Sequence, residues 1–143
     1  MKLPAKIEYA YKAVIELAFR YNGDRPVQIS TVCEAQGIPK KFLIQLLLRL
    51  KNANIVDSSR GVAGGYYLTR PPSRISLADI FRAIDETIID APKKTKSAKV
   101  SNADDLLLSI WGNISKEVVA RLEEATFDKL ISQIKKEQLV YHI

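Results

Sequence analysis

A glycine-rich stretch carries the clearest chemical signal in the sequence, Arg60-Gly61-Val62-Ala63-Gly64-Gly65-Tyr66-Tyr67-Leu68. Glycines adopt positive φ at little steric cost, so Gly61, Gly64 and Gly65 permit a tight hairpin over residues 55–69. Such a hairpin holds Arg60 at its base, and because glycine has no side chain the backbone of the loop can approach a binding partner closely. We interpret this stretch, including Tyr66, as the wing of a DNA-binding domain.

A second group of side chains follows a helical repeat just before the hairpin. The predicted helix covers residues 39–53, and its outward face carries Lys40, Lys41, Ile44, Gln45 and Arg49. In a major groove the first turns of a helix lie near base edges, where lysine contacts guanine or phosphate, glutamine pairs with adenine and isoleucine lies against a thymine methyl. We expect the first four residues to lie near bases and Arg49, with Lys51, to meet phosphates.

The wing adds Arg60, which we expect to enter a narrow minor groove, where the negative potential is enhanced. An alternative interpretation is that the lysines are solvated helix-end charges and that the glycines only form a turn. Ile44 and Leu48 lie one turn apart on the otherwise polar face, and packing under the wing or the first helix is an alternative role for them.

The surrounding pattern predicts the elements that hold these side chains in place. Residues 5–21 form one amphipathic helix, residues 29–36 form a second that Gly37 ends, and Pro39 opens the third in its first turn. The core stripe of the third helix consists of Phe42, Leu43, Leu46, Leu47 and Leu50. Two short helices joined by a glycine turn and followed by a hairpin make a winged helix-turn-helix. The predicted fold class is mainly α with a small β-hairpin.

A long helix after the wing predicts how two copies of the chain associate. It begins near residue 101 or 102 and runs to about Glu124, which corresponds to roughly 36 Å. Its apolar seam steps by three or four residues through Leu107, Trp111, Ile114, Val118 and Leu122, close to the heptad spacing of paired helices. Pairing with its twin predicts a homodimer whose recognition helices lie roughly 34 Å apart, and hence a palindromic operator. The alternative is packing against its own domain.

Two regions divide the chain. Residues 1–75 are predicted to form the winged helix-turn-helix, and residues 76–143 a helical linker and the long dimerisation helix. In the second region Ser76 and Asp79 predict a capping box for a helix over 77–86, the stretch 87–100 is predicted to be mobile, and a last helix covers 126–137. The net charge of +6 is uneven, with 12 Lys/Arg against 5 Asp/Glu in residues 1–75 and 10 against 11 in the rest. This bias suggests that the first region faces a polyanion, although a solvated basic surface is an equal alternative.

The chain has one cysteine and one histidine, too few for an intramolecular disulfide or for a metal site built from cysteine and histidine ligands. Cys33 has no partner for an intramolecular disulfide, and His142 has no neighbouring ligand or nucleophile, so we predict neither a metal site nor an enzyme. Cys33 is predicted to be a small apolar residue on the inner face of the second helix; the alternative is a redox-sensing thiol. The sequence has no membrane-length apolar run and no signal-peptide core, which predicts a cytoplasmic protein that does not contact a membrane.

Several short motifs occur together in one order, namely Tyr9-Ala10, Gln36-Gly37-Ile38, Phe42-Leu43, Gln45-Leu46-Leu47, Arg60-Gly61-x-x-Gly64-Gly65-Tyr66-x-Leu68, Ala83-Ile84-Asp85 and Trp111. Over about residues 1–130 the chain thereby resembles the Rrf2 family of bacterial transcription regulators. The resemblance implies a homodimeric winged helix-turn-helix with the third helix in the major groove, Arg60 in the minor groove and a long dimerisation helix.

The sequence departs from the family pattern in two places. Many members bind an iron–sulfur cluster through three cysteines before the long helix, whereas residues 87–105 contain none, so no cofactor is expected. Ile44 stands where an iron–sulfur member has a glutamate that selects the operator type, so operator preference does not carry over. At Cys33 family members typically have a small residue such as alanine, which favours the core role.

We therefore predict a sequence-specific DNA-binding transcriptional regulator, a repressor, that acts as a homodimer on double-stranded DNA. The alternative is a dimeric winged-helix module that acts mainly through protein contacts, for example with a metabolic enzyme. The sequence identifies neither the operator, the target genes nor the sign of regulation. The sensed signal also stays open, with an effector metabolite, a protein partner, Cys33 oxidation and no signal at all as the alternatives.

Overall fold

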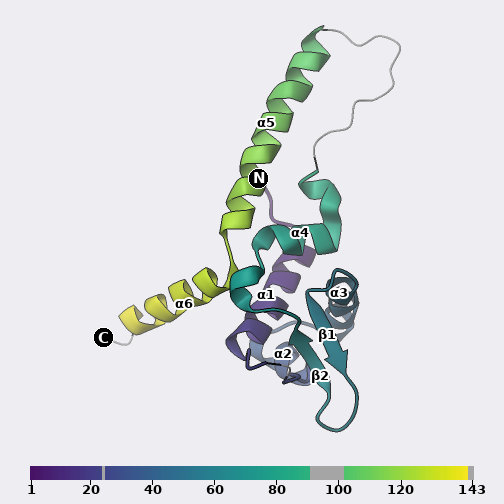
Figure 1. The fold of residues 1–143 in the computed structure, drawn as a ribbon, viewed down its shortest axis with the longest axis vertical. Coiled ribbons are helices and arrows are strands. Elements are labelled where there is room, and N and C mark those ends of the chain that lie inside the picture. Colours follow the sequence, from purple (N-terminus) through teal and green to yellow (C-terminus); the bar gives the residue numbers. More distant parts are fainter. Residues whose placement is uncertain (24, 91–101, 142–143) are drawn as a thin grey trace.

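α1 (Ala5–Phe19) forms the centre of the fold, and the other elements pack around it. The structure is a computed structural model that describes residues 1–23, 25–90 and 102–141. After α1 come α2 (Ile29–Gln36), α3 (Lys40–Asn52), β1 (Val56–Ser59), β2 (Gly65–Leu68), a 3-10 turn η1 (Pro72–Arg74), α4 (Leu77–Asp85), a second turn η2 (Glu86–Ile88), α5 (Asn102–Glu124) and α6 (Phe127–Tyr141). Figure 1 shows α1 enclosed by α2, α3, α4 and the start of α6.

A single hydrophobic cluster joins the elements before and after the wing. Ala10, Val14 and Leu17 of α1 pack in the same cluster as Ile80 of α4 and Phe127 of α6. Glu16 of α1 is also buried, and its carboxylate accepts hydrogen bonds from Arg20 and Gln36, each at 2.8 Å. The expected boundary between residues 75 and 76 therefore lies inside one core, and α4 and the start of α6 fold together with the helix-turn-helix.

The helix-turn-helix has the local features that its sequence predicts. Gly37 follows α2 with φ of 64°, a left-handed conformation that glycine adopts without strain, and its N–H donates to the carbonyl oxygen of Cys33. Pro39 was expected in the first turn of α3, but it is the residue before the helix, with an extended backbone. From there α3 buries Leu43, Leu46, Leu47 and Leu50.

The wing is a two-stranded antiparallel hairpin with an added bridge from the segment before α2. Val56 pairs with Leu68 and Ser59 with Gly65 at its two ends. Val27 bridges Tyr66 through two backbone hydrogen bonds of 2.7 and 2.9 Å, so the lead-in to α2 lies beside β2. This close approach needs a glycine, because a Cβ on Gly65 would collide with the carbonyl oxygen of Val27.

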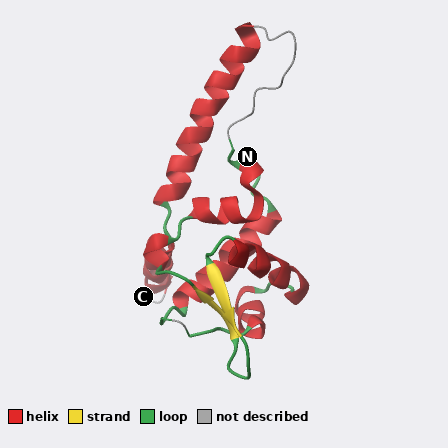
Figure 2. Cartoon of the chain, turned by 45° about the vertical axis from the view of Figure 1, so that its right-hand side comes forward, coloured by secondary structure: helices red, strands yellow, loops and turns green. Residues whose placement is uncertain are grey.

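The long helix leaves the core as an arm. α4 begins with the predicted capping box, in which Ser76 and Asp79 bond each other's backbone N–H groups, and α5 then extends away from it (Figure 1). Figure 2 shows the free end of α5 and the loop of the wing at opposite ends of the molecule. None of the residues of α5 is fully buried against the rest of the chain.

Four further expectations need correction. Phe42 was placed in the core, but it is 51% exposed and stacks on Tyr9 of α1, with 6.3 Å between ring centroids, because its position on α3 faces α1 at the surface. The last helix runs on to Tyr141. In the predicted mobile stretch, Ile89 is buried after η2, so the first part is anchored by an apolar contact; residues 91–100 lie outside the described residues. Ile44 and Leu48 are exposed rather than packed under the wing or α1.

Two glycine substitutions are expected to have opposite effects on stability. Gly65→Ala introduces the collision with Val27 and is expected to destabilise the fold by about 1–3 kcal/mol, as overpacking generally does. Gly112→Ala lies in α5 with no atom within 4 Å of the added methyl group, and replacing a mid-helix glycine stabilises by about 1 kcal/mol. Thermal or urea unfolding of both variants checks this contrast. Equal stability of Gly65→Ala and the unsubstituted chain would contradict the close approach at β2.

Candidate nucleic-acid interface

The outward face of α3 offers a mixed polar and apolar surface. Lys41, Ile44 and Gln45 are exposed there, as predicted, and Leu48, one turn after Ile44, has 51% of its surface exposed. The four buried leucines on the other side fix the rotation of the helix. The side chains that face outward can therefore contact base edges by hydrogen bonds from Lys41 and Gln45 and by apolar contact from Ile44 and Leu48.

A hollow on the wing side of α3 gathers basic and hydrogen-bonding groups. Lys40, Arg60, Ser30 and Gln28 line it together with the glycines of the wing. Ser30 lies in the first turn of α2, where backbone N–H groups have no acceptor within the helix and favour an anion. Neither Lys40 nor Arg60 has a hydrogen bond or ion pair with the described part of the chain, so both cations are free to bind a partner.

The tip of the wing is shaped by Gly61 and tied to α2. Gly61 has φ of 112°, a conformation that other residues rarely adopt. The Gln28 side chain donates to the carbonyl oxygen of Val62 at 3.4 Å, and Val62 itself is fully exposed at the tip. Gly64 has no room for a side chain, because a Cβ would collide with the carbonyl oxygen of Ser59. The predicted wing residues thus lie in one narrow loop beside the N-terminus of α2.

Two basic residues of α3 that were expected at phosphates have partners within the chain. Lys51 donates to Oγ of Ser58 at 2.7 Å and lies 3.7 Å from the Asp57 carboxylate. It therefore ties α3 to β1 and sets the angle of the wing. Arg49 donates through Nη1 to the carbonyl oxygen of Ile84 at 2.7 Å, which links α3 to the end of α4 while the residue stays exposed.

Sequence reasoning missed several residues of this surface. Gln28 and Ser30 belong to it because the wing folds over the start of α2, and Lys6 and Tyr9 of α1 lie beside Gln45 and Arg49 of α3. Ser30 is the second residue of α2, after the N-cap Gln28 and Ile29, and a serine in the first turn of a predicted helix was a usable signal in the sequence. Nothing local marks Lys6, because its neighbours on α3 follow it by some forty residues.

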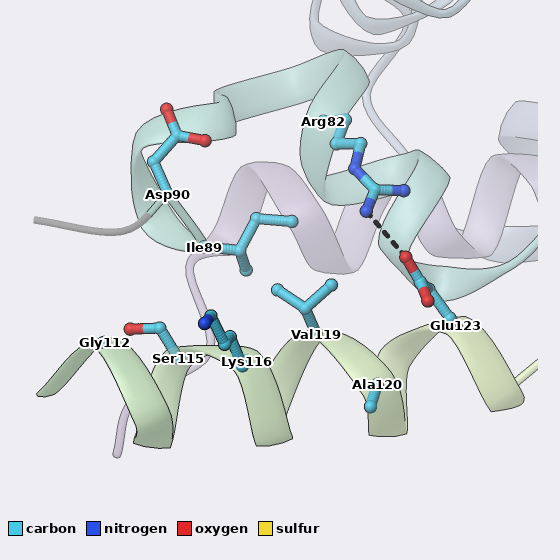
Figure 3. A pocket seen from close by; sticks show the side chains of 9 residues that line it. All are labelled: Arg82, Ile89, Asp90, Gly112, Ser115, Lys116, Val119, Ala120 and Glu123. Atoms are coloured by element: carbon cyan, nitrogen blue, oxygen red, sulfur yellow. Dashed lines mark hydrogen bonds and ion pairs between the residues drawn. The ribbon is translucent and has the colours of Figure 1, made fainter. Parts of the chain in front are cut away.

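The junction of α4 and α5 sets where the arm points. Arg82 of α4 and Glu123 of α5 form an ion pair of 2.8 Å, and Arg82 also lies 3.9 Å from Asp79. Figure 3 shows this pair at one side of a pocket, with Ile89 and Val119 facing each other across it. The apolar contact and the ion pair together hold the C-terminal half of α5 on α4.

The N-terminal half of α5 carries the predicted dimerisation residues on an open surface. Leu107, Trp111 and Ile114 are 62%, 54% and 43% exposed. Val118 and Leu122 are half-buried and line a hollow with Phe81 and the N-terminal segment. The described part of the chain therefore leaves a long apolar stripe on α5 without a partner, and packing against its own domain accounts only for the C-terminal end of that stripe.

Cys33 is half-buried on α2 and packs against the hydrophobic core beside Val32. This placement fits a small apolar core residue. No helix within residues 1–23, 25–90 and 102–141 combines the length and the apolar character that crossing a bilayer requires.

Comparisons with known proteins agree with this geometry. Residues 3–133 match the model of the Rrf2 family, described as an iron-dependent transcriptional regulator. An HTH-type transcriptional regulator IscR of Xenorhabdus nematophila is 31% identical over 132 residues, covering 92% of this chain and 79% of the relative. A protein of Synechocystis sp. named as an HTH-type transcriptional regulator is 34% identical over 130 residues, or 91% of this chain and 87% of the relative.

Solved structures show the same arrangement of elements. IscR of T. potens superposes with a TM-score of 0.76 at 28% identity, covering 96% of this chain and 91% of the other. CymR of B. subtilis, titled the global cysteine regulator, superposes with a TM-score of 0.75 at 27% identity, covering 93% and 98%. The winged helix-turn-helix fold predicted from sequence is thereby confirmed, as is the assignment to transcriptional regulators rather than enzymes.

Proposed function

The chain belongs to the Rrf2 family of DNA-binding transcriptional regulators, and from this premise we propose that it is a repressor that binds a palindromic operator as a homodimer. One observation carries most of the proposal. The free cations Lys40 and Arg60 and the outward face of α3 lie together on one side of the chain. A helix with such a face, flanked by a basic wing, suits a major groove and the minor groove next to it.

Each residue of the interface receives a proposed role. Lys41, Ile44 and Gln45 contact base edges in the major groove, and Lys40 meets the phosphate beside the wing. Arg60 enters the minor groove, where Gly61, Gly64 and Gly65 let the loop approach and Tyr66 braces it through its bridge to Val27. Arg49 binds a phosphate with the guanidinium N–H groups that are not used in its hydrogen bond to the carbonyl oxygen of Ile84.

Dimerisation through α5 accounts for the apolar stripe of Leu107, Trp111 and Ile114. Each side chain would be withdrawn from water by the same stripe on a second copy, since a two-fold interface pairs a surface with itself. In this division of labour residues 1–75 read DNA and residues 76–143 hold the two copies together. The two recognition helices would then enter successive major grooves on one face of the DNA, roughly 34 Å apart.

The iron dependence in the description of the family does not transfer to this chain. Iron–sulfur clusters are held by cysteine thiolates, and the chain has the single cysteine Cys33, which packs against the core. The described residues also contain no cluster of three or more His, Cys, Asp or Glu side chains suited to a metal ion. We therefore assign no cluster, and we propose that a cytoplasmic metabolite or a protein partner supplies the signal.

A second candidate function has one observation in its favour. Leu139 and Val140 near the end of α6 are 67% and 70% exposed, and this half of the helix projects away from the body (Figure 1). Apolar residues in such a position suit a protein contact. The chain would then be a dimeric winged-helix module that acts chiefly through another protein, such as a metabolic enzyme, and that binds DNA weakly.

Selection of operators from random DNA by the purified protein tests the first function. We expect enrichment of an inverted repeat whose half-sites are centred about one helical turn, roughly 10 base pairs, apart. Binding to it should weaken steeply as salt is raised, because phosphate contacts release counterions. Enrichment of no inverted repeat, together with weak binding that hardly responds to salt, would favour the second function instead.

A further inference from the structure

A surface between α1 and α3 lies on the side of the recognition helix away from the wing. It is a hollow lined mainly by Lys6 and Tyr9 of α1 and by Phe42, Gln45 and Arg49 of α3. We propose that this hollow is a phosphate clamp, which holds the DNA backbone of the strand opposite the one beside the wing. The proposal rests on the DNA-binding function above and adds Lys6 and Tyr9 to the interface.

The position of the clamp follows from the geometry of α3. Lys40 and Arg49 are nine residues apart, roughly two and a half helical turns, which puts them on opposite sides of the helix. Lys40 faces the wing hollow and Arg49 faces the clamp. A helix about 10–12 Å across fills a major groove about 12 Å wide, so a phosphate strand passes on each side of it. Cations on both sides of α3 therefore match the two strands that bound one groove.

The clamp contains hydrogen-bond donors that have no acceptor within the described residues. The Lys6 ammonium and the Tyr9 hydroxyl have no hydrogen bond or ion pair with the described residues. No carboxylate lines the hollow. Lysine and tyrosine side chains are common donors to phosphate oxygens, and a phosphate between Lys6 and Arg49 would lie between two positive charges beside the Tyr9 hydroxyl.

The clamp is held in place before any ligand arrives. The bond from Arg49 to the carbonyl oxygen of Ile84 restrains its guanidinium, and the remaining N–H groups of a five-donor fork stay available. The rings of Tyr9 and Phe42 stack with an interplanar angle of 15°. This contact explains why an apolar residue stands exposed at position 42, since it supports the tyrosine that faces the hollow.

The test measures DNA affinity of the full-length protein over a range of salt concentrations. Lys6→Gln is the test variant, and Lys12→Gln is its control, because Lys12 lies on the same helix but pairs with Glu8 at 3.3 Å. The probes are the selected operator and an unrelated duplex of equal length. Lys6→Gln should weaken binding to both by about fivefold at fixed salt and reduce the slope of log affinity against log salt by about 1. Lys12→Gln should change neither.

Two further outcomes separate the clamp from the general function. Tyr9→Phe keeps the ring stack on Phe42 and removes the hydroxyl, and we expect a loss of about threefold for one hydrogen bond. If the unsubstituted protein binds the operator but Lys6→Gln and Tyr9→Phe both behave like Lys12→Gln, the clamp is wrong and the proposed function stands. If the unsubstituted protein itself shows no salt-dependent DNA binding, the proposed function fails.

Discussion

Ile114→Asp is expected to turn the proposed homodimer into a monomer at micromolar concentration and to lower operator affinity by at least about 100-fold. Ile114 lies in the middle of the apolar stripe on α5 and is 43% exposed in the single chain. In the proposed two-fold interface the new carboxylate would be withdrawn from water among the apolar side chains of the stripe, such as Leu107 and Trp111. Burial of an unpaired charge costs several kcal/mol, and we expect this cost to exceed the free energy that the remaining apolar contacts of the stripe contribute to dimerisation.

Operator affinity falls because the two DNA-binding domains are no longer joined in one dimer. Two half-site contacts on one dimer act at high effective concentration, and a linked pair can bind 10²–10⁴ times more tightly than one module. Sedimentation measures the association state, and titration with the selected operator measures the affinity. The monomer should keep its helical content and its thermal stability, because the substituted side chain contacts little within the chain.

Asn113→Asp is the matched control for this substitution. It adds the same charge to the neighbouring position of α5, about 100° around the helix from Ile114, where the residue is exposed. It should remain dimeric. Trp111→Ala offers a milder test, since it removes apolar area without adding charge and should weaken the dimer. A dimer that survives both Ile114→Asp and Trp111→Ala would show that the copies associate elsewhere, or through other contacts.

Arg60→Ala is expected to have the next largest effect, a loss of operator affinity of about 10- to 100-fold, or roughly 1–3 kcal/mol. Arg60 is exposed and has no partner within the described chain, so its removal should leave both stability and dimerisation unchanged. In a narrow minor groove the loss comes from the guanidinium, which is less strongly hydrated than an ammonium and enters the groove more readily.

Two variants make this prediction sharper. Arg60→Lys keeps the charge and is expected to recover only part of the affinity, because lysine binds phosphate as a point charge and is costly to desolvate in the groove. Arg121→Ala removes the same charge from α5, where the residue is 85% exposed and pairs with Glu124, and it should bind the operator normally. Equal affinity of Arg60→Ala and Arg121→Ala for the operator would remove the wing from the mechanism.

Much of the fold can be predicted from local patterns. The bounds of α2 agree with the expected 29–36 because Gly37 has to end the helix, and the start of α4 follows from the capping box of Ser76 and Asp79. α5 was expected to run from residue 101 or 102 to 124, and it covers Asn102–Glu124. Each of these signals acts between residues at most four apart, which is the range over which helix caps and apolar repeats operate.

Side chains whose partners lie far along the chain were the ones assigned wrongly or missed. Phe42 fits the apolar repeat of α3, but the ring on which it packs is that of Tyr9, and the contact lies at the surface. Lys51 is of a residue type that often contacts phosphate, but its ammonium donates to Ser58 and pairs with the Asp57 carboxylate. A helical repeat gives the angle of a residue around its own helix and says nothing about what stands opposite.

The sequence by itself determined the winged helix-turn-helix, the three glycines that form the wing, the apolar stripe on α5 and the lack of ligands for a family-type iron–sulfur cluster. Each depends on residue type and short spacing. Only the tertiary structure decided that Val27 lies beside Tyr66, that Arg49 is tied to the end of α4, and that Lys6 and Tyr9 face the recognition helix. Those relations join residues at least 33 positions apart, the separation of Tyr9 and Phe42, and they arise because the helices share one hydrophobic core and must pack around α1 to bury it.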